Sequence, residues 1–148
     1  VETSRKAGPM MLNRHPGYRA PILATSLGQV YLAFGSSEER EAVLAREAEN
    51  SDPWNNIARD PATAKKFFDD IRRRGYAIMH PDYSRIEYRH TMTSVGVPIM
   101  SDSEVFASIN VLYLKKALTS EQAVRTLLKP LQATAKKIAE ELARRSDK

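Results

Sequence analysis

The chain has 148 residues, of which 42% are hydrophobic and 28% are charged, a composition that is typical of a folded domain and excludes wholesale disorder. Its formal net charge of +5 permits contact with nucleic acid without requiring it. The absence of cysteine excludes disulfides, thiol nucleophiles and thiolate metal sites. No apolar run approaches the length of a membrane helix and nothing resembles a secretory signal, so we expect a cytoplasmic protein with no membrane partner.

Turn-forming residues dominate the beginning of the chain, where we predict two short strands, at residues 2–6 and 10–13. Apolar residues at helical spacing then predict a helix over residues 22–34. Pro21 suits the start of this helix, and Gly35 suits its end.

Two more helices are predicted from their capping signals. Ser36 begins a Ser-Ser-Glu-Glu capping box, which favours a short helix that ends near Glu49. Asp60 and Pro61 are a cap followed by an N1 proline, and Gly75 suits the end of the helix that they begin. The segment between these helices is predicted to be a loop, with the only tryptophan of the chain as its anchor.

Beyond Gly75 the hydrophobic period changes from that of a helix to that of a strand. Residues 76–79 form the first predicted strand, and apolar residues also alternate with polar ones over residues 86–93. Residues 95–100 and 105–114 are two further predicted strands. Only a short Ser- and Asp-containing turn separates this last pair, which therefore predicts an antiparallel hairpin.

Thr119 opens another capping box and a long final helix, in which Pro130 is expected to cause a kink. The dense basic runs at residues 72–74 and 136–137 are interpreted as solvated helix faces. These elements together predict an α+β fold, a central antiparallel sheet flanked by helices.

No established catalytic motif is present, since the chain lacks nucleophile-elbow, zinc-protease, Walker and dinucleotide-binding patterns. The three histidines, His15, His80 and His90, are far apart, and their spacing does not support a metal site. We therefore expect a protein that is not an enzyme and that needs neither a metal ion nor a cofactor.

Asn110 is the most informative polar residue, because it interrupts an otherwise buried-looking strand. Ser108 and Asn110 share one face of that strand, since alternate strand residues point the same way. A buried amide needs hydrogen-bond partners. Either a neighbouring backbone group satisfies Asn110 or a polar ligand does so, in a pocket between the sheet and a helix.

The sequence Thr25-Ser26-Leu27-Gly28 offers a second candidate site near the head of the first helix. Unpaired N–H groups at a helix start, together with the helix dipole, favour an anion such as a carboxylate. The alternative is an ordinary helix start, in which Gly28 permits close packing.

Four stretches of the chain carry a family resemblance, at residues 17–33, 71–77, 95–99 and 105–111. They read GYRAPILATSLGQVYLA, IRRRGYA, VGVPI and VFASINV. In this order and spacing they resemble the C-terminal effector-binding domain of the IclR family of bacterial transcriptional regulators, over nearly the whole chain. The subgroup that senses aromatic acids is the most similar.

The resemblance implies a GAF-like (profilin-like) fold, a small organic acid as effector, and self-association into dimers or tetramers. It also implies that operator DNA is contacted only through an N-terminal winged helix-turn-helix, and we expect residues 1–148 to be the effector-binding domain without that part. In the family, the carboxylate of the ligand contacts the backbone that corresponds to Ser26 and Leu27 here. Ser26 stands where alanine is common in the family and adds a hydroxyl. Leu112 is apolar where regulators of very small keto acids are polar, and together with the small Ala20 it favours a larger, less polar effector such as an aromatic acid.

The predicted effector pocket lies between the start of the residue 22–34 helix and the hairpin strand. We expect at most one of Arg89 and His90 to enter this pocket. The residues expected to supply its apolar wall and its polar groups are Leu12, Ala20, Thr25, Ser26, Leu27, Gly28, Tyr76, Arg89, His90, Ser108, Asn110 and Leu112. An alternative function is a free-standing GAF-like sensor module of another signalling protein. A third, less favoured hypothesis is an enzyme on a similar scaffold.

Overall fold

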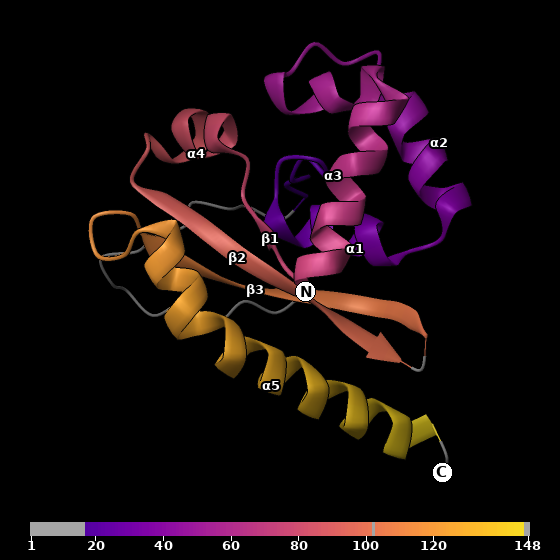
Figure 1. Cartoon of the computed structure of the whole chain (residues 1–148), viewed down its shortest axis with the longest axis vertical. Helices are drawn as coiled ribbons and strands as arrows, with labels where there is room; N and C mark the ends of the chain where they lie inside the picture. Colours follow the sequence, from indigo (N-terminus) through magenta and orange to yellow (C-terminus); the bar gives the residue numbers. More distant parts are fainter. Residues whose placement is uncertain (1–16, 102, 147–148) are drawn as a thin grey trace.

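A three-stranded antiparallel sheet separates two groups of helices in the computed structural model, which describes residues 17–101 and 103–146 (Figure 1). The sheet order is β1 (Ala77–Ile78), β2 (Met92–Ser101) and β3 (Glu104–Leu114). One long helix covers one face, and the helices from the first half of the chain cover the other. The α+β class is thus confirmed; the two strands predicted at residues 2–6 and 10–13 lie outside the described residues.

The predicted hairpin is confirmed as β2 and β3, which pair antiparallel along their length. Gly96 is opposite Asn110 in this register, so both residues lie in the middle of the hairpin. The register shifts near Ile99 and Met100, and the extra residue on β3 is Phe106, which is 60% exposed. A bulge of this kind bends a strand and turns one side chain away from the ladder.

Helix α1 (Ser26–Phe34) begins four residues later than the sequence predicts. The reason is a turn closed by the Pro21 carbonyl, which accepts hydrogen bonds from the amides of Ala24 and Thr25 at 3.2 Å. Thr25 then caps the helix, because its Oγ1 accepts a hydrogen bond from the Gly28 amide at 3.1 Å. The predicted end of the helix at residue 35 is confirmed.

The capping signals of the next two helices are confirmed. In α2 (Ser37–Glu47) the Ser36 side chain accepts a hydrogen bond from an amide of the first turn. In α3 (Pro61–Arg74) Asp60 does the same, and Gly75 ends the helix with a left-handed φ of 77°. That conformation costs glycine little, which is why this residue stops the helix where it does.

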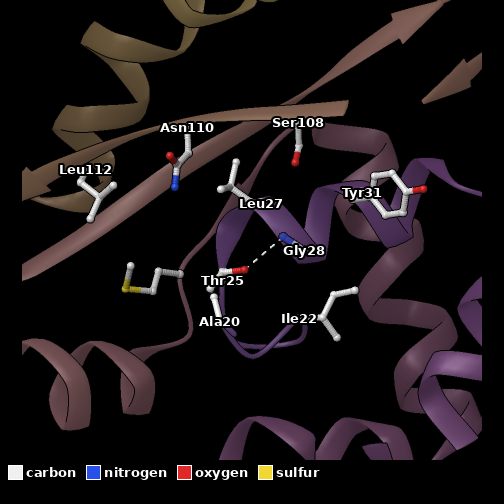
Figure 2. A pocket seen from close by; sticks show the side chains of 10 residues that line it. Ala20, Ile22, Thr25, Leu27, Gly28, Tyr31, Ser108, Asn110 and Leu112 are labelled. Atoms are coloured by element: carbon white, nitrogen blue, oxygen red, sulfur yellow. Dashed lines mark hydrogen bonds between the residues drawn. The ribbon is translucent and has the colours of Figure 1, made fainter. Parts of the chain in front are cut away.

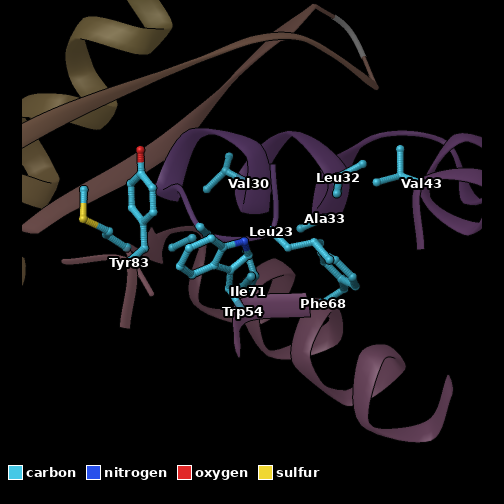
Figure 3. Packing of buried hydrophobic residues seen from close by; sticks show 12 residues of the cluster. Leu23, Val30, Leu32, Ala33, Val43, Trp54, Phe68, Ile71 and Tyr83 are labelled. Carbon is cyan, nitrogen blue, oxygen red and sulfur yellow. The ribbon is translucent and has the colours of Figure 1, made fainter. Parts of the chain in front are cut away.

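The segment predicted to be a loop contains a 3-10 helix, η1 (Pro53–Arg59), and the tryptophan anchor is confirmed. Trp54 is only 6% exposed and meets the Tyr83 ring edge to face at 5.4 Å. Figure 3 shows both rings in the apolar cluster that joins α1 to α3, together with Leu23, Val30, Phe68 and Ile71.

The strand that the alternation over residues 86–93 predicts is wrong for the first part of this segment, because helix α4 (Pro81–Tyr88) extends into it. His80 caps this helix through Nδ1, which accepts a hydrogen bond from the Asp82 amide at 3.2 Å. Arg89 and His90 both have positive φ angles, 49° and 63°, and end the helix before the strand begins. The two left-handed residues reverse the chain, so only the last part of the alternating segment is extended.

Helix α5 (Ser120–Ser146) packs against the other face of the sheet (Figure 1). Its capping box is confirmed, since Thr119 and Gln122 exchange backbone-to-side-chain hydrogen bonds of 2.8 and 3.2 Å. Leu131 and Ala135 are buried against Val97 and other apolar residues of the sheet. Within residues 17–101 and 103–146, no helix is long and apolar enough to cross a membrane.

Two arginines hold the C-terminal end of α1. Arg40, from α2, donates to the Leu32 carbonyl at 3.0 Å, and Arg72, from α3, donates to the Ala33 carbonyl at 2.7 Å. The last carbonyls of a helix lack intrahelical donors, so these guanidinium groups satisfy them. Helix α1 is therefore fixed at this end by both of its neighbouring helices.

Candidate functional site

A cavity of about 380 Å³ lies between the first turns of α1 and one face of β3 (Figure 2). The residues that line it come from the α1 turn, from α1 itself, from the end of β1 and from β3: Ala20, Ile22, Thr25, Leu27, Gly28, Tyr31, Met79, Ser108, Asn110 and Leu112. None of these lining residues carries a charged side chain. The wall is mainly apolar with a few polar groups, as in most small-molecule sites.

Strand periodicity explains the polar wall of the cavity. Ser108, Asn110 and Leu112 alternate along β3 and so point to one face of the sheet. Figure 2 shows these side chains directed towards Leu27 and Gly28 of α1. The structure therefore brings together residues more than 80 positions apart, as the sequence predicts for Asn110 and the α1 start.

Two glycines allow α1 to approach its neighbours closely enough to form this wall. A Cβ on Gly28 would lie 2.1 Å from the Ile22 carbonyl oxygen, so the turn before α1 folds directly over this residue. A Cβ on Gly96 of β2 would lie 2.9 Å from the Ser26 carbonyl oxygen. The start of α1 is thus seated against both the preceding turn and the centre of the sheet.

Ser26 does not line the cavity but lies directly behind it. Its side chain is fully buried, its Oγ is 2.7 Å from Ser94 Oγ, and it accepts a hydrogen bond from Asn110 Nδ2 at 3.3 Å. The hydrogen-bond partner of the Asn110 amide is therefore a side-chain hydroxyl and not the neighbouring backbone group that was one of the two alternatives from the sequence. Asn110 itself is only half-buried and stays accessible from the cavity.

The first turn of α1 presents backbone donors at the edge of the cavity. Thr25 already satisfies the Gly28 amide. The amides of Ser26 and Leu27 have no carbonyl acceptor in the part of the chain that the structure describes. This turn also contains no acidic side chain, so the positive end of the helix dipole is not neutralised locally. Of these two residues only Leu27 lines the cavity, so an anion there would find the Leu27 amide and a favourable potential.

The structure does not bring every predicted residue to the cavity. Tyr76 packs in the cluster between the sheet and α5, with the Arg74 guanidinium carbon 5.0 Å from its ring centroid. Arg89 and His90 are exposed at the left-handed end of α4, and neither lines the cavity. Leu12 lies outside the described residues.

Three lining residues were missed by sequence reasoning: Ile22, Tyr31 and Met79. Tyr31 was within reach, since it stands one helical turn beyond Leu27 and faces the same side. Met79 carries no such signal. Its place depends on a long-range hydrogen bond from the His80 amide to the Ala24 carbonyl, at 2.8 Å, which ties the end of β1 to the turn before α1.

The donor set does not favour metal chemistry. Among the described residues there is no group of three or more His, Asp or Glu side chains that is able to hold an ion. An antiparallel sheet with helices on both faces and a mainly apolar cavity beside the first helix defines the class of GAF-like α+β domains with a small-molecule cavity.

The family model for the bacterial transcriptional regulator IclR C-terminal domain matches residues 2–140, and the chain belongs to this family. The family and the GAF-like fold predicted from the sequence motifs are thereby confirmed. Members of this family are transcriptional regulators and not enzymes, which also confirms the expectation that the chain is not an enzyme.

Solved structures of similar fold include IclR of Thermotoga maritima, with 26% identity and a TM-score of 0.68 over 93% of this chain. The repressor BlcR of Agobacterium tumefaciens has 20% identity and a TM-score of 0.66 over 88% of this chain. The inducer-binding domain of a PobR double mutant from Acinetobacter, in complex with 3-hydroxybenzoic acid, has 21% identity and a TM-score of 0.63 over 84%.

The chain matches only part of these proteins. It covers 52% of the Thermotoga regulator, 51% of the Agobacterium repressor and 69% of the PobR domain. The chain thus spans about half the length of two of these three regulators.

Proposed function

We propose that this chain is the effector-binding domain of a cytoplasmic bacterial transcriptional regulator, and that its effector is a small aromatic acid. The observation that carries the proposal is the cavity itself. Backbone donors of α1 lie at one edge, Ser108 and Asn110 lie on the opposite wall, and apolar side chains lie between them. This arrangement suits a flat apolar ligand with polar groups at its two ends.

The carboxylate of the effector binds the backbone at the start of α1, with the Leu27 amide as the donor that lines the cavity, where the helix dipole favours negative charge. The ring packs against Leu27 and Leu112, and a ring substituent reaches Ser108 and Asn110. The cavity volume of about 380 Å³ lies in the range of small-molecule sites. The PobR inducer-binding domain, which has a similar fold, was solved with 3-hydroxybenzoic acid, and this supports an aromatic acid for the present chain.

The effector acts by shifting populations and not by chemistry. A ligand moves an equilibrium between two arrangements only by its difference in affinity for them. We propose that these are arrangements of a dimer or tetramer, and that a winged helix-turn-helix domain outside these residues contacts the operator DNA. Analytical ultracentrifugation of the chain tests the self-association, and a monomer at every accessible concentration contradicts it.

Calorimetric titration with a panel of acids tests the effector class. The panel contains hydroxylated benzoates, hydroxylated phenylpropionates and small keto acids, and we expect one of the aromatic acids to bind. In the Ser108→Phe variant the new ring fills the cavity and should abolish binding. The matched control is Ser101→Phe, which places the same ring on the hairpin outside this cavity and should leave binding intact. Binding of the keto acids alone would contradict the aromatic class.

A further inference from the structure

Three polar side chains form a continuous chain from the interior of the protein to the cavity wall. Ser94 on β2 and Ser26 on α1 are both 0% exposed, and their hydroxyl oxygens are 2.7 Å apart. Asn110 on β3 donates from Nδ2 to Ser26 Oγ at 3.3 Å. Of the three, only Asn110 lines the cavity. The side chain of Ser94 is therefore linked to the cavity by hydrogen bonds that pass through Ser26 and Asn110.

The hydrogen-bonding capacity of Ser26 explains how this link works. A hydroxyl has one proton to donate and can also accept. Ser26 accepts from Asn110 Nδ2, and either hydroxyl can donate in the 2.7 Å contact between Ser26 Oγ and Ser94 Oγ. We take Ser26 as the donor, so its proton goes to Ser94. Without Ser94 that proton is buried with no acceptor, which is costly. The Ser26 hydroxyl can then donate to Asn110 Oδ1 instead. This requires the side-chain amide of Asn110 to rotate so that Oδ1 and Nδ2 exchange places.

The position of Ser26 leaves little freedom for other arrangements. Gly96 lies opposite Asn110 in the hairpin register, and its missing side chain lets the Ser26 backbone rest against β2. The Ser26 hydroxyl is thereby held between the Ser94 side chain of β2 and the Asn110 side chain of β3.

We propose that Ser94 is a positioning residue, which acts through Ser26 to fix the Asn110 amide so that its Oδ1 accepts a hydrogen bond from a hydroxyl group of the effector. This inference rests on the proposed function. It extends that proposal from the class of the effector to a preference for acids with a hydroxyl group. In the described residues no protein donor pairs with Oδ1. An acid with a phenolic hydroxyl satisfies this acceptor, whereas the corresponding methoxy acid has no proton to offer.

The first test needs no ligand. In the isotope-labelled full chain, NMR reports the side-chain amide signals of Asn110, and we expect Ser94→Ala and Ser26→Ala to shift them in the same direction. The matched control is Ser108→Ala, which removes a hydroxyl from the same wall but not from this chain of hydrogen bonds. Ser94→Cys keeps the volume with a weaker partner and serves as a second variant if Ser94→Ala does not fold. Unchanged Asn110 signals in the folded Ser94 variant would overturn the positioning role.

The second test measures selectivity by calorimetry with 3-hydroxybenzoate and 3-methoxybenzoate. We expect the parent chain to prefer the hydroxy acid by about tenfold, and Ser94→Ala to reduce this preference about three- to tenfold. Asn110→Leu should abolish the preference, and adding Ser94→Ala to it should change nothing further. Independent, additive losses would overturn the inference while leaving the proposed function standing. If neither acid binds the parent chain, the proposal of an aromatic effector fails, and the Asn110 signals still decide the role of Ser94.

Discussion

Gly28 shows how strictly the backbone limits the site. A methyl group there would lie 2.1 Å from the Ile22 carbonyl oxygen, a contact with the main chain that no side-chain rotation relieves. We expect Gly28→Ala to lower the free energy of unfolding by about 1–3 kcal/mol, as overpacking usually does. Urea unfolding measures this loss, with Gly35→Ala as the comparison, because a Cβ at Gly35 would also meet a backbone oxygen, that of Tyr31, but at the longer distance of 3.0 Å. A loss in Gly28→Ala no larger than in Gly35→Ala would mean that the turn before α1 adjusts freely.

Asn110 is the residue whose replacement separates binding from folding. Leucine suits a half-buried strand position, so the Asn110→Leu variant should fold and keep its circular dichroism spectrum. The variant should bind a polar effector about 1–3 kcal/mol more weakly, because a polar group of the ligand loses its partner. Calorimetry with the acid that binds the parent chain measures the difference. Equal affinity in a folded variant would make Asn110 a structural residue that holds Ser26 and nothing more.

At the residue scale, regular periodicity decided what was predictable. Ser108, Asn110 and Leu112 follow from strand alternation, which places them on one face whatever the remaining fold is. Tyr76 was misplaced because alternation alone does not say which face of the sheet carries the cavity. Met79 had no local signal at all, since its place depends on a hydrogen bond between distant segments.

Helix α4 depends on an uncharged histidine. His80 Nδ1 caps the helix by accepting a hydrogen bond, and a protonated ring nitrogen has no lone pair for this. Burial lowers the pKa of His80, and the Asp82 carboxylate, 4.0 Å away, opposes the shift only in part. The unfolded chain therefore takes up this proton at a higher pH than the folded chain does. Stability from this group is complete above the unfolded pKa and is lost as the pH falls towards the folded pKa.

Thermal unfolding between about pH 7.5 and pH 5.5 tests this dependence. We expect the melting temperature of the parent chain to fall as the pH decreases over this window. The His80→Asn variant should show a flatter profile, because an asparagine side chain caps a helix without titrating. His90→Asn is the matched control, since the His90 side chain is exposed and accepts no hydrogen bond from a helix amide, while asparagine tolerates its left-handed backbone. This variant should keep the parent slope. A parent-like slope in His80→Asn would contradict the role of the cap.

The same helix marks the limit of prediction at the element scale. The alternation of residues 86–93 is compatible with a strand. No nearby sequence signal predicts that two residues other than glycine adopt a left-handed backbone conformation there. The signal that was available is His80-Pro81, a cap followed by an N1 proline, but histidine is not among the common cap residues. Elements with ordinary caps, such as α2 and α3, were predicted within about two residues of their ends, which is within the usual variation of assigned helix boundaries.

The charge distribution over the whole molecule argues against DNA binding by these residues. Several exposed basic side chains are paired with acidic neighbours on their own helices, as in Lys65–Asp69 and Arg73–Asp70 on α3. Arg73, Arg74 and the residues 136–137 are exposed, as predicted for solvated helix faces, whereas Arg72 is the exception to a solvated face because it holds the end of α1. We expect negligible affinity for duplex DNA in fluorescence anisotropy. Tight, sequence-specific binding that weakens steeply with salt would contradict this expectation.

Helix α1 is electrically balanced at one end only. Its C-terminal partial charge, roughly half an elementary charge, is met by Arg40 and Arg72, whereas its first turn has no acidic side chain. A carboxylate bound there completes the balance. Because the two arginines belong to α2 and α3, the added stability would extend into both helices instead of remaining at the cavity. Amide hydrogen exchange in α1, α2 and α3 should then become slower together when an acid binds, while α5, across the sheet, should keep its own rate.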